Sequence, residues 1–283
     1  MKKHKICKIL LVILAIFLCV AFYELLGICV AYKKQPEVSN TTKKETKNGS
    51  WNECSENTER AVIIEKNPEA LLQRVRLIKN AKKEIILSTF AFQSDESGKL
   101  ILGALHDAAD RGVHIRLLVD GMESWIDMEG NPYFYGLSSH ENVEIKLYNK
   151  ANPLKPWKMM GRMHDKYLIA DGKRYILGGR NTYNYFLGDF PGHKNYDRDV
   201  LVVCDEPEKE NSVNQLLEYF ETIWEQEDSG YFHDNKKLAN RKSVKNAVLE
   251  LQNGYQKYFE ENKERICDTD YRSEERRVGK ECR

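Results

Sequence analysis

The sequence predicts an α/β sandwich behind an N-terminal transmembrane helix, and two observations predict this architecture. Residues 9–32 form one apolar run, and residues 60–239 then alternate helical and strand-like apolar patterns. Strands that alternate with amphipathic helices are typical of an α/β sandwich with parallel strand pairs. We therefore predict a mixed α/β domain attached to a membrane segment.

The first segment has the length and the flanking charges of a membrane anchor. Residues 9–32 are apolar apart from Glu24 and Gly27, and about 20 apolar residues suffice to cross a bilayer. We predict that residues 1–34 anchor the chain; a cleaved secretory signal is the alternative, for which Cys29-Val30-Ala31 is a poor cleavage site. The excess of lysine before the run favours an N-terminus inside and a domain outside the cytoplasm.

Two further segments lie outside the expected domain. Residues 35–59 are dominated by Ser, Thr, Asn and Lys, a composition typical of a flexible stalk. Residues 272–283 read RSEERRVGKECR and resemble the in-frame translation of a common sequencing adapter; an ordinary charged tail is the alternative. We expect the domain to occupy residues 60–271 and the natural reading frame to continue beyond Tyr271.

The expected elements follow from apolar spacing and from caps. Asn67 is expected to cap the first helix, because Pro68 suits the first helical position. Gly112 suits the end of a second helix over residues 100–111. Asp205 is expected to cap the first of two long C-terminal helices, whose apolar stripes include Val213, Leu216, Phe220 and Ile223, and then Val244, Val248, Leu251, Tyr255 and Tyr258. Strands are expected at residues 84–92, 113–119, 143–147, 164–170, 174–177 and 199–204.

Composition narrows the function classes without choosing one. The formal net charge is +1, so the chain as a whole offers no electrostatic argument for binding nucleic acid. Its seven cysteines form no C-x-x-C pair, so we predict no zinc site. No other metal-ligand set is present, and we predict no cofactor.

The chemistry is concentrated in residues 162–181. On the expected strand over residues 164–170, His164 and Lys166 are two apart and share one face. Asp171 follows at the strand end. Gly178 and Gly179 then allow a close approach of the backbone to a ligand, and Asn181 offers an amide donor.

The pattern H-x-K-x(4)-D followed by x(6)-G-G-x-N resembles the HKD motif of the phospholipase D superfamily. The resemblance extends to residues 87–121, which are similar to the first half of bacterial cardiolipin synthases, and downstream to GGRNTYNYF and YDRDVLVV. It implies a phospholipase D-type α/β/α sandwich, the first of two halves, and an enzyme that acts on glycerophospholipid by hydrolysis or phosphatidyl transfer.

The resemblance also implies a role for each residue of the motif. His164 would be the nucleophile that forms a phosphohistidine, or the acid that protonates the leaving alkoxide. Lys166 and Asn181 would bind the non-bridging phosphate oxygens, with Gly178 and Gly179 beside them. Asp171 would orient the imidazole. His193 is interpreted as an ordinary loop residue.

Active sites of this family use two HKD motifs, and the sequence contains one. Either a second half follows in the same chain, in which case this piece is inactive by itself, or two copies pair as a homodimer, as in single-motif nucleases of the family. A near-neutral charge counts against the nuclease, and the intact motif counts against a degenerate binding module. Residues 150–162 contain Lys150, Lys155, Lys158 and Arg162 with Trp157, Met159 and Met160; they are expected either to meet anionic headgroups of the membrane or to form a solvated loop.

Overall fold

The computed structural model describes residues 2–33, 40, 59–158, 160–206, 211–233 and 235–271. The described chain divides into two compact units: one contains the first helix together with Ala151–Arg162, and the other contains the remaining elements. The expected stalk, apart from residues 40 and 59, and the whole adapter-like tail lie outside the described residues.

The N-terminal unit is built on α1 (Lys2–Lys33). Its stretch Lys5–Ala31 is 27 residues long, contains an 18-residue window with a mean hydropathy of 2.9 and is long and apolar enough to cross a membrane. Residues 151–162 contribute the short 3₁₀ helix η1 (Pro156–Lys158) to the same unit. The helix α1 therefore has the length and composition of the predicted membrane anchor.

The larger unit is built on one mixed eight-stranded sheet. Its strands are β1 (Glu59–Ile64), β2 (Glu84–Thr89), β3 (His114–Asp120), β4 (Val143–Tyr148), β5 (Lys166–Ala170), β6 (Arg174–Gly178), β7 (Asp199–Cys204) and β8 (Ser229–Tyr231). The spatial order is β1-β7-β6-β5-β2-β3-β4-β8. Only β2, β3 and β4 pair in parallel, and the other neighbours are antiparallel. The parallel pairs predicted from helix–strand alternation are thus confirmed in the centre of the sheet.

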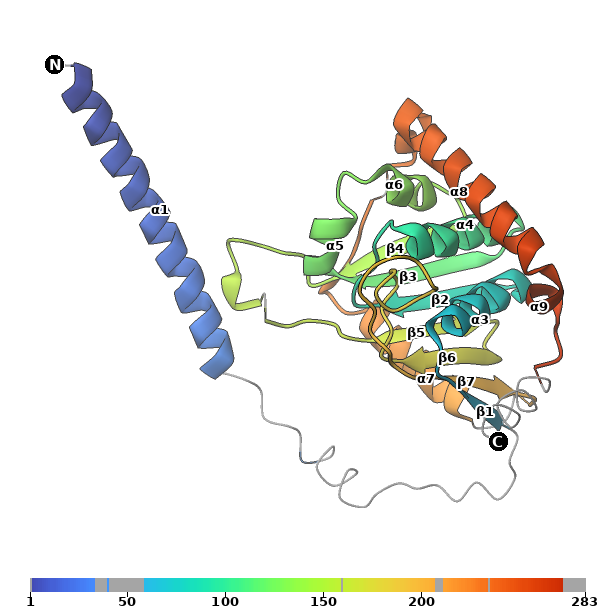
Figure 1. Cartoon of the computed structure of the whole chain (residues 1–283). Helices are drawn as coiled ribbons and strands as arrows, with labels where there is room; N and C mark the ends of the chain where they lie inside the picture. Colours follow the sequence, from blue (N-terminus) through green and yellow to red (C-terminus); the bar gives the residue numbers. More distant parts are fainter. Residues whose placement is uncertain are drawn as a thin grey trace. The chain divides into compact units, whose positions relative to one another are not determined.

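Helices cover both faces of this sheet (Figure 1). They are α3 (Asn67–Asn80), α4 (Glu96–Asp110), α5 (Gly121–Asp127), α6 (Pro132–Ser138), α7 (Ser212–Trp224), the 3₁₀ helix η2 (Lys236–Asn240), α8 (Lys242–Glu261) and α9 (Lys263–Cys267). The helices α3, α4, α6, α8 and α9 share one hydrophobic cluster with one face of the strands, whereas α7 packs on the other face. The predicted α/β sandwich is confirmed, with three layers.

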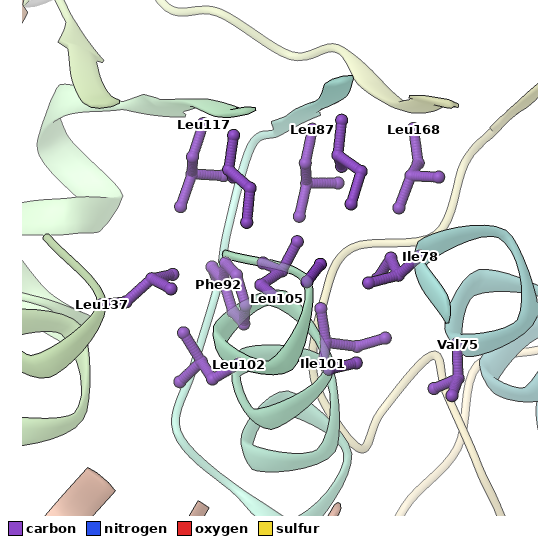
Figure 2. Packing of buried hydrophobic residues seen from close by; sticks show 14 of the residues in the cluster. Val75, Ile78, Leu87, Phe92, Ile101, Leu102, Leu105, Leu117, Leu137 and Leu168 are labelled. Carbon is purple, nitrogen blue, oxygen red and sulfur yellow. The ribbon is translucent and has the colours of Figure 1, made fainter. Parts of the chain in front are cut away.

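The period of two along β5 separates the two cores. Leu168 and Ala170 belong to the larger cluster, and Tyr167 and Ile169 belong to the cluster under α7. In Figure 2, Leu87, Leu117 and Leu168 from three strands lie over side chains of α4 and its neighbours, among them Val75, Ile78, Phe92, Ile101, Leu102, Leu105 and Leu137. The strands β2, β3 and β5 therefore lie between two apolar layers.

Two predicted helix caps are wrong. Asn67 lies inside α3, whose N-cap is Lys66; the Asn67 side chain instead bonds to the backbone of Asn195 and accepts from Arg180. Asp205 forms an ion pair with Arg60 rather than capping α7. In both cases the polar side chain bonds to a distant part of the chain, which local spacing does not reveal. The side chain of Asn211 caps α7.

Candidate active site

The candidate site lies where β5 begins and β2 ends. The two strands are antiparallel, and Thr89 pairs with Lys166. His164 precedes β5 instead of lying on it, because regular strand geometry starts only at Lys166. The prediction that both side chains share a strand face is therefore wrong for His164, and a different contact brings the two residues together.

Phe90, directly after β2, makes that contact. The His164 and Phe90 rings meet edge to face, with 4.6 Å between their centroids. The Lys166 ammonium lies 5.2 Å from the centroid of the same ring, within the range of a cation–π interaction. Lys166 Nζ also donates to the carbonyl oxygen of His164 at 2.7 Å. The imidazole is exposed while the lysine is only 6% exposed, so an approaching ligand would meet His164 first.

Burial lowers the pKa of Lys166, because the site withdraws the ammonium from water; the negative charges of Asp165 and Asp197 act in the opposite direction. A poorly hydrated ammonium binds an anion more strongly than a hydrated one does. Lys166 is therefore placed as a cation that a phosphate group would neutralise.

Asn181 is linked to the same edge of the sheet through Ala91, the residue that follows Phe90. Its Oδ1 accepts from the backbone N–H of Ala91 at 3.3 Å, and the backbones of Ala91 and Thr182 are hydrogen-bonded at 3.0 Å. With Oδ1 engaged, the amide presents its NH₂ group as a donor. A hydrogen bond from Asn181 opposes the increase in the pKa of Tyr183 that burial causes.

Three contacts fix the loop that carries His164. The N–H of Met163 donates to Asp120 Oδ2 at 3.1 Å, and Asp120 Oδ1 caps α5. The N–H of Asp165 donates to the Met163 sulfur at 3.3 Å. On the other side, Tyr219 of α7 donates to Asp165 Oδ2 at 2.8 Å. The residues on both sides of His164 are therefore held, while the imidazole stays accessible.

The two glycines make room for protein atoms. A Cβ at Gly178 would overlap Asp199 Oδ1, and a Cβ at Gly179 would overlap the Asp197 carboxylate. Both glycines therefore let the chain at the start of β7 pack closely against the segment that leads to Asn181. Direct phosphate binding by either glycine stays a prediction.

A buried ionic cluster supports this packing. Asp199, which is fully buried, pairs with Arg74 at 2.9 Å and with Arg180 at 3.2 Å. Arg180 also donates to the carbonyl oxygens of Ile64 and Glu65 and to Asn67 Oδ1. Because Arg180 precedes Asn181, the cluster fixes the backbone on which the amide donor is mounted.

The structure places Asp171 away from His164. Asp171 follows the last residue of β5, a five-residue strand that spans roughly 17 Å at about 3.3 Å per residue. Its carboxylate accepts from the backbone N–H groups of Lys82, Lys83 and Glu84 at 2.7–3.1 Å. This carboxylate closes the connection between α3 and β2 and does not contact the imidazole.

Other histidines that the structure describes have contacts elsewhere. His106 and His140 share the carboxylate of Asp110, His114 contacts Glu144, and His193 lies against Tyr185. In the described part of the chain, no group of three or more His, Cys, Asp and Glu is placed to hold a metal ion. The converging groups are thus one imidazole, one ammonium and one amide, which suits a phosphate anion.

Comparison with known proteins agrees with this chemistry. A family model described as "Cardiolipin synthase, PLD-like domain" matches residues 74–224, more than half of the chain. The chain belongs to the phospholipase D superfamily. The matched residues include β2 to β7 and α7 and therefore contain the whole candidate site.

Individual relatives of this phospholipase D-like chain are longer than it is. An uncharacterized protein of Helicobacter pylori is 31% identical over 206 residues, covering 68% of this chain and 38% of the relative. Cardiolipin synthase C of Escherichia coli is 29% identical over 171 residues, covering 56% of this chain and 34% of the relative. The chain thus spans about a third of the length of these curated relatives. Among solved structures, phosphatidylserine synthase of Haemophilus influenzae has a TM-score of 0.51 at 17% identity, covering 77% of this chain and 48% of that one, which supports the fold.

Phe90, Asp120 and Tyr219 take part in this phospholipase D-like site and were missed from the sequence. Phe90 carries one weak signal, since it follows a buried strand at the edge where the motif strand begins. Asp120 and Tyr219 reach the His164 loop through single hydrogen bonds from distant elements. Such contacts cannot be predicted from a local sequence pattern.

Proposed function

We propose that this domain is one catalytic half of a phospholipase D-type enzyme that cleaves or transfers a phosphatidyl group of a glycerophospholipid through a phosphohistidine at His164. The observation that carries the proposal is the convergence of three side chains on two adjacent residues. Phe90 contacts both His164 and Lys166, and Ala91 bonds to Asn181.

In the first step, an imidazole nitrogen of His164 attacks phosphorus, the P–N bond forms and the P–O bond to the headgroup breaks. The Lys166 ammonium and the Asn181 NH₂ group stabilise the charge on the non-bridging oxygens, and each such donor typically contributes about 10²–10³ in rate. In the second step, water or an alcohol attacks phosphorus and His164 leaves. Hydrolysis and transfer share the phosphohistidine and differ only in this acceptor.

An acid must protonate the leaving alkoxide and then, as a base, deprotonate the acceptor. None of the other histidines discussed above lies beside His164. We infer that a second HKD half supplies this group, either in the same polypeptide or from a second copy of this chain. Asp171 enters the proposal as the residue that closes the α3–β2 connection, and Gly178 and Gly179 enter it through the packing behind Asn181.

The membrane is part of the proposal. We propose that α1 remains uncleaved and anchors the domain at a bilayer, on its outer side, where glycerophospholipid is available. The apolar length of α1 supports this assignment, as does the excess of lysine before it.

The test is product formation from headgroup-labelled phosphatidylglycerol in nanodiscs, with the chain alone and with the chain joined to a second HKD half. We expect a phosphatidyl adduct on His164 and release of labelled headgroup. His164→Ala should remove both, whereas His193→Ala should be silent. Normal turnover in His164→Ala would refute the catalytic assignment. Turnover of a nucleic-acid substrate alone would retain His164 and replace lipid by nucleic acid, as expected for a homodimeric nuclease.

A further inference from the structure

Residues 151–162 belong to the same compact unit as the apolar helix α1 and pack against it, apart from the unit that contains the sheet. Tyr23 of α1 donates to the carbonyl oxygen of Leu154 at 2.9 Å. Gly27, one turn further along, faces Pro156 so closely that a Cβ would overlap the proline ring. The helix therefore offers a hydrogen-bond donor and a gap to this one segment.

The position of these contacts along α1 indicates their depth in a membrane. The apolar stretch Lys5–Ala31 has 27 residues, about 40 Å at 1.5 Å per residue, against a hydrocarbon core of about 30 Å. Tyr23 and Gly27 precede its end by roughly 12 and 6 Å on the same rise. The contacts thus lie near the border between hydrocarbon and headgroups, where tyrosine is enriched.

The segment itself has the composition of an interfacial loop. Leu154, Trp157 and Met160 are 79%, 46% and 50% exposed, and Lys155 and Lys158 stand between them. Exposed apolar side chains of this size are costly in water and favourable in the interface, while lysine side chains extend toward phosphate groups. Internal bonds satisfy part of the backbone, with the N–H of Lys158 donating to Lys155 O at 2.9 Å and that of Gly161 to Lys158 O at 3.0 Å.

We propose that Ala151–Arg162 is a lipid-binding segment that α1 seats in the headgroup layer, with anionic phospholipid as its partner. The inference rests on the proposed anchor. Only Met163 separates Arg162 from His164, so a headgroup held by this segment is adjacent along the chain to the nucleophile. This second step, delivery of substrate, rests on the proposed function, whereas the lipid contact does not.

The full chain labelled with 5-fluorotryptophan, in nanodiscs of phosphatidylglycerol and phosphatidylcholine, tests the contact directly. Trp125 is the internal control, because it is 65% exposed and lies on α5 in the other unit. The Trp157 resonance is assigned by its absence in Trp157→Phe. We expect a lipid-borne nitroxide to erase the Trp157 resonance and to spare Trp125, and a water-soluble nitroxide to do the reverse.

Two sets of variants separate the contribution of the lysine charges from that of the contact with α1. Lys155→Gln and Lys158→Gln should each lower the lipid-bound fraction about 5-fold in phosphatidylglycerol discs and have little effect in pure phosphatidylcholine. Tyr23→Phe should also lower it, whereas Tyr219→Phe, which removes a similar hydrogen bond in the other unit, should not. Trp157 quenched by the water-soluble agent to the same extent as Trp125 would overturn the proposal, as would a mature chain that lacks α1. Because no readout needs turnover, a lipid-embedded Trp157 in a chain that stays inactive when it is joined to a second HKD half would refute the proposed function alone.

Discussion

Replacing Phe90 by leucine should change the chemistry of Lys166 more than it changes the fold. The ring is half-buried and contacts the two groups that the proposed mechanism needs, the His164 imidazole and the Lys166 ammonium. Leucine keeps an apolar side chain, shorter than that of phenylalanine, and removes the negative face of the aromatic ring. The variant therefore removes the electrostatic part of the contact and keeps an apolar residue at this position.

The magnitude follows from the geometry. At 5.2 Å from the ring centroid, and with Lys166 largely withdrawn from water, a cation–π interaction stabilises the ammonium by about 0.5–2 kcal/mol. Since 1.36 kcal/mol corresponds to one pKa unit, losing it should lower the pKa of Lys166 by about 0.4–1.5 units. Burial already lowers this pKa, so both effects have the same sign, and the ammonium is lost at a lower pH.

The assay is ¹³C NMR of the full chain with labelled lysine, in which Lys166→Arg identifies the Lys166 signal. Activity should follow: the alkaline limb of the pH–rate profile, where the ammonium deprotonates, should move to lower pH by the same amount. Phe92→Leu is the matched control, because Phe92 is buried against Phe134; it should reduce the free energy of unfolding and leave the titration unchanged. An unchanged Lys166 pKa in Phe90→Leu, with the fold intact, would show that the ring does not stabilise the cation.

Three further predictions address stability and anchoring. Asp199→Ala removes the carboxylate with which two buried guanidinium groups pair, and it should lower the free energy of unfolding by about 3–5 kcal/mol. Asp205→Ala, in a surface pair, should lower it by only about 0–1 kcal/mol, and equal losses in denaturant titrations would contradict the buried cluster. Asp171→Ala removes the acceptor of three backbone N–H groups and should cost about 1–3 kcal/mol without changing the titration of Lys166; a change in that titration would instead link Asp171 to the site. Intact mass of the membrane fraction should show that residues 1–34 are retained, and a mature chain that begins after Ala31 would identify a secretory signal.

The sheet could be predicted because its determinants are local. Apolar runs bounded by turn residues located β2 to β7, and residues 199–204 were predicted with the bounds that the structure has. Gly112 ends α4 with a φ of +87°, as its position after the helical pattern indicated. The order of the strands depends on contacts between distant segments, which a pattern along the chain does not contain.

The candidate site, like the sheet, was predictable in part from the sequence and in part not. The sequence pointed to His164, Lys166 and Asn181 as candidates through the resemblance of their spacing to the HKD motif. Spacing also suggested wrongly that His164 continues the strand. A strand position would orient the imidazole through backbone geometry, whereas a loop position requires side-chain contacts, and the structure supplies them from Phe90, from Asp120 behind Met163, and from Tyr219 behind Asp165.

The residues of the motif lie at two ends of one strand and make different contacts. His164 and Lys166 lie where β5 begins, and Asp171 lies where it ends, bonded to the backbone that leads into β2. Phe90 and Ala91 directly follow the other end of β2. Asp171 therefore fixes the start of the strand, and the residues after its end contact the imidazole, the ammonium and the amide. A carboxylate bonded to the backbone can in this way belong to the same sequence pattern as the proposed nucleophile. The spacing H-x-K-x(4)-D then spans β5, with the candidate site at one end and a carboxylate bonded to backbone N–H groups at the other.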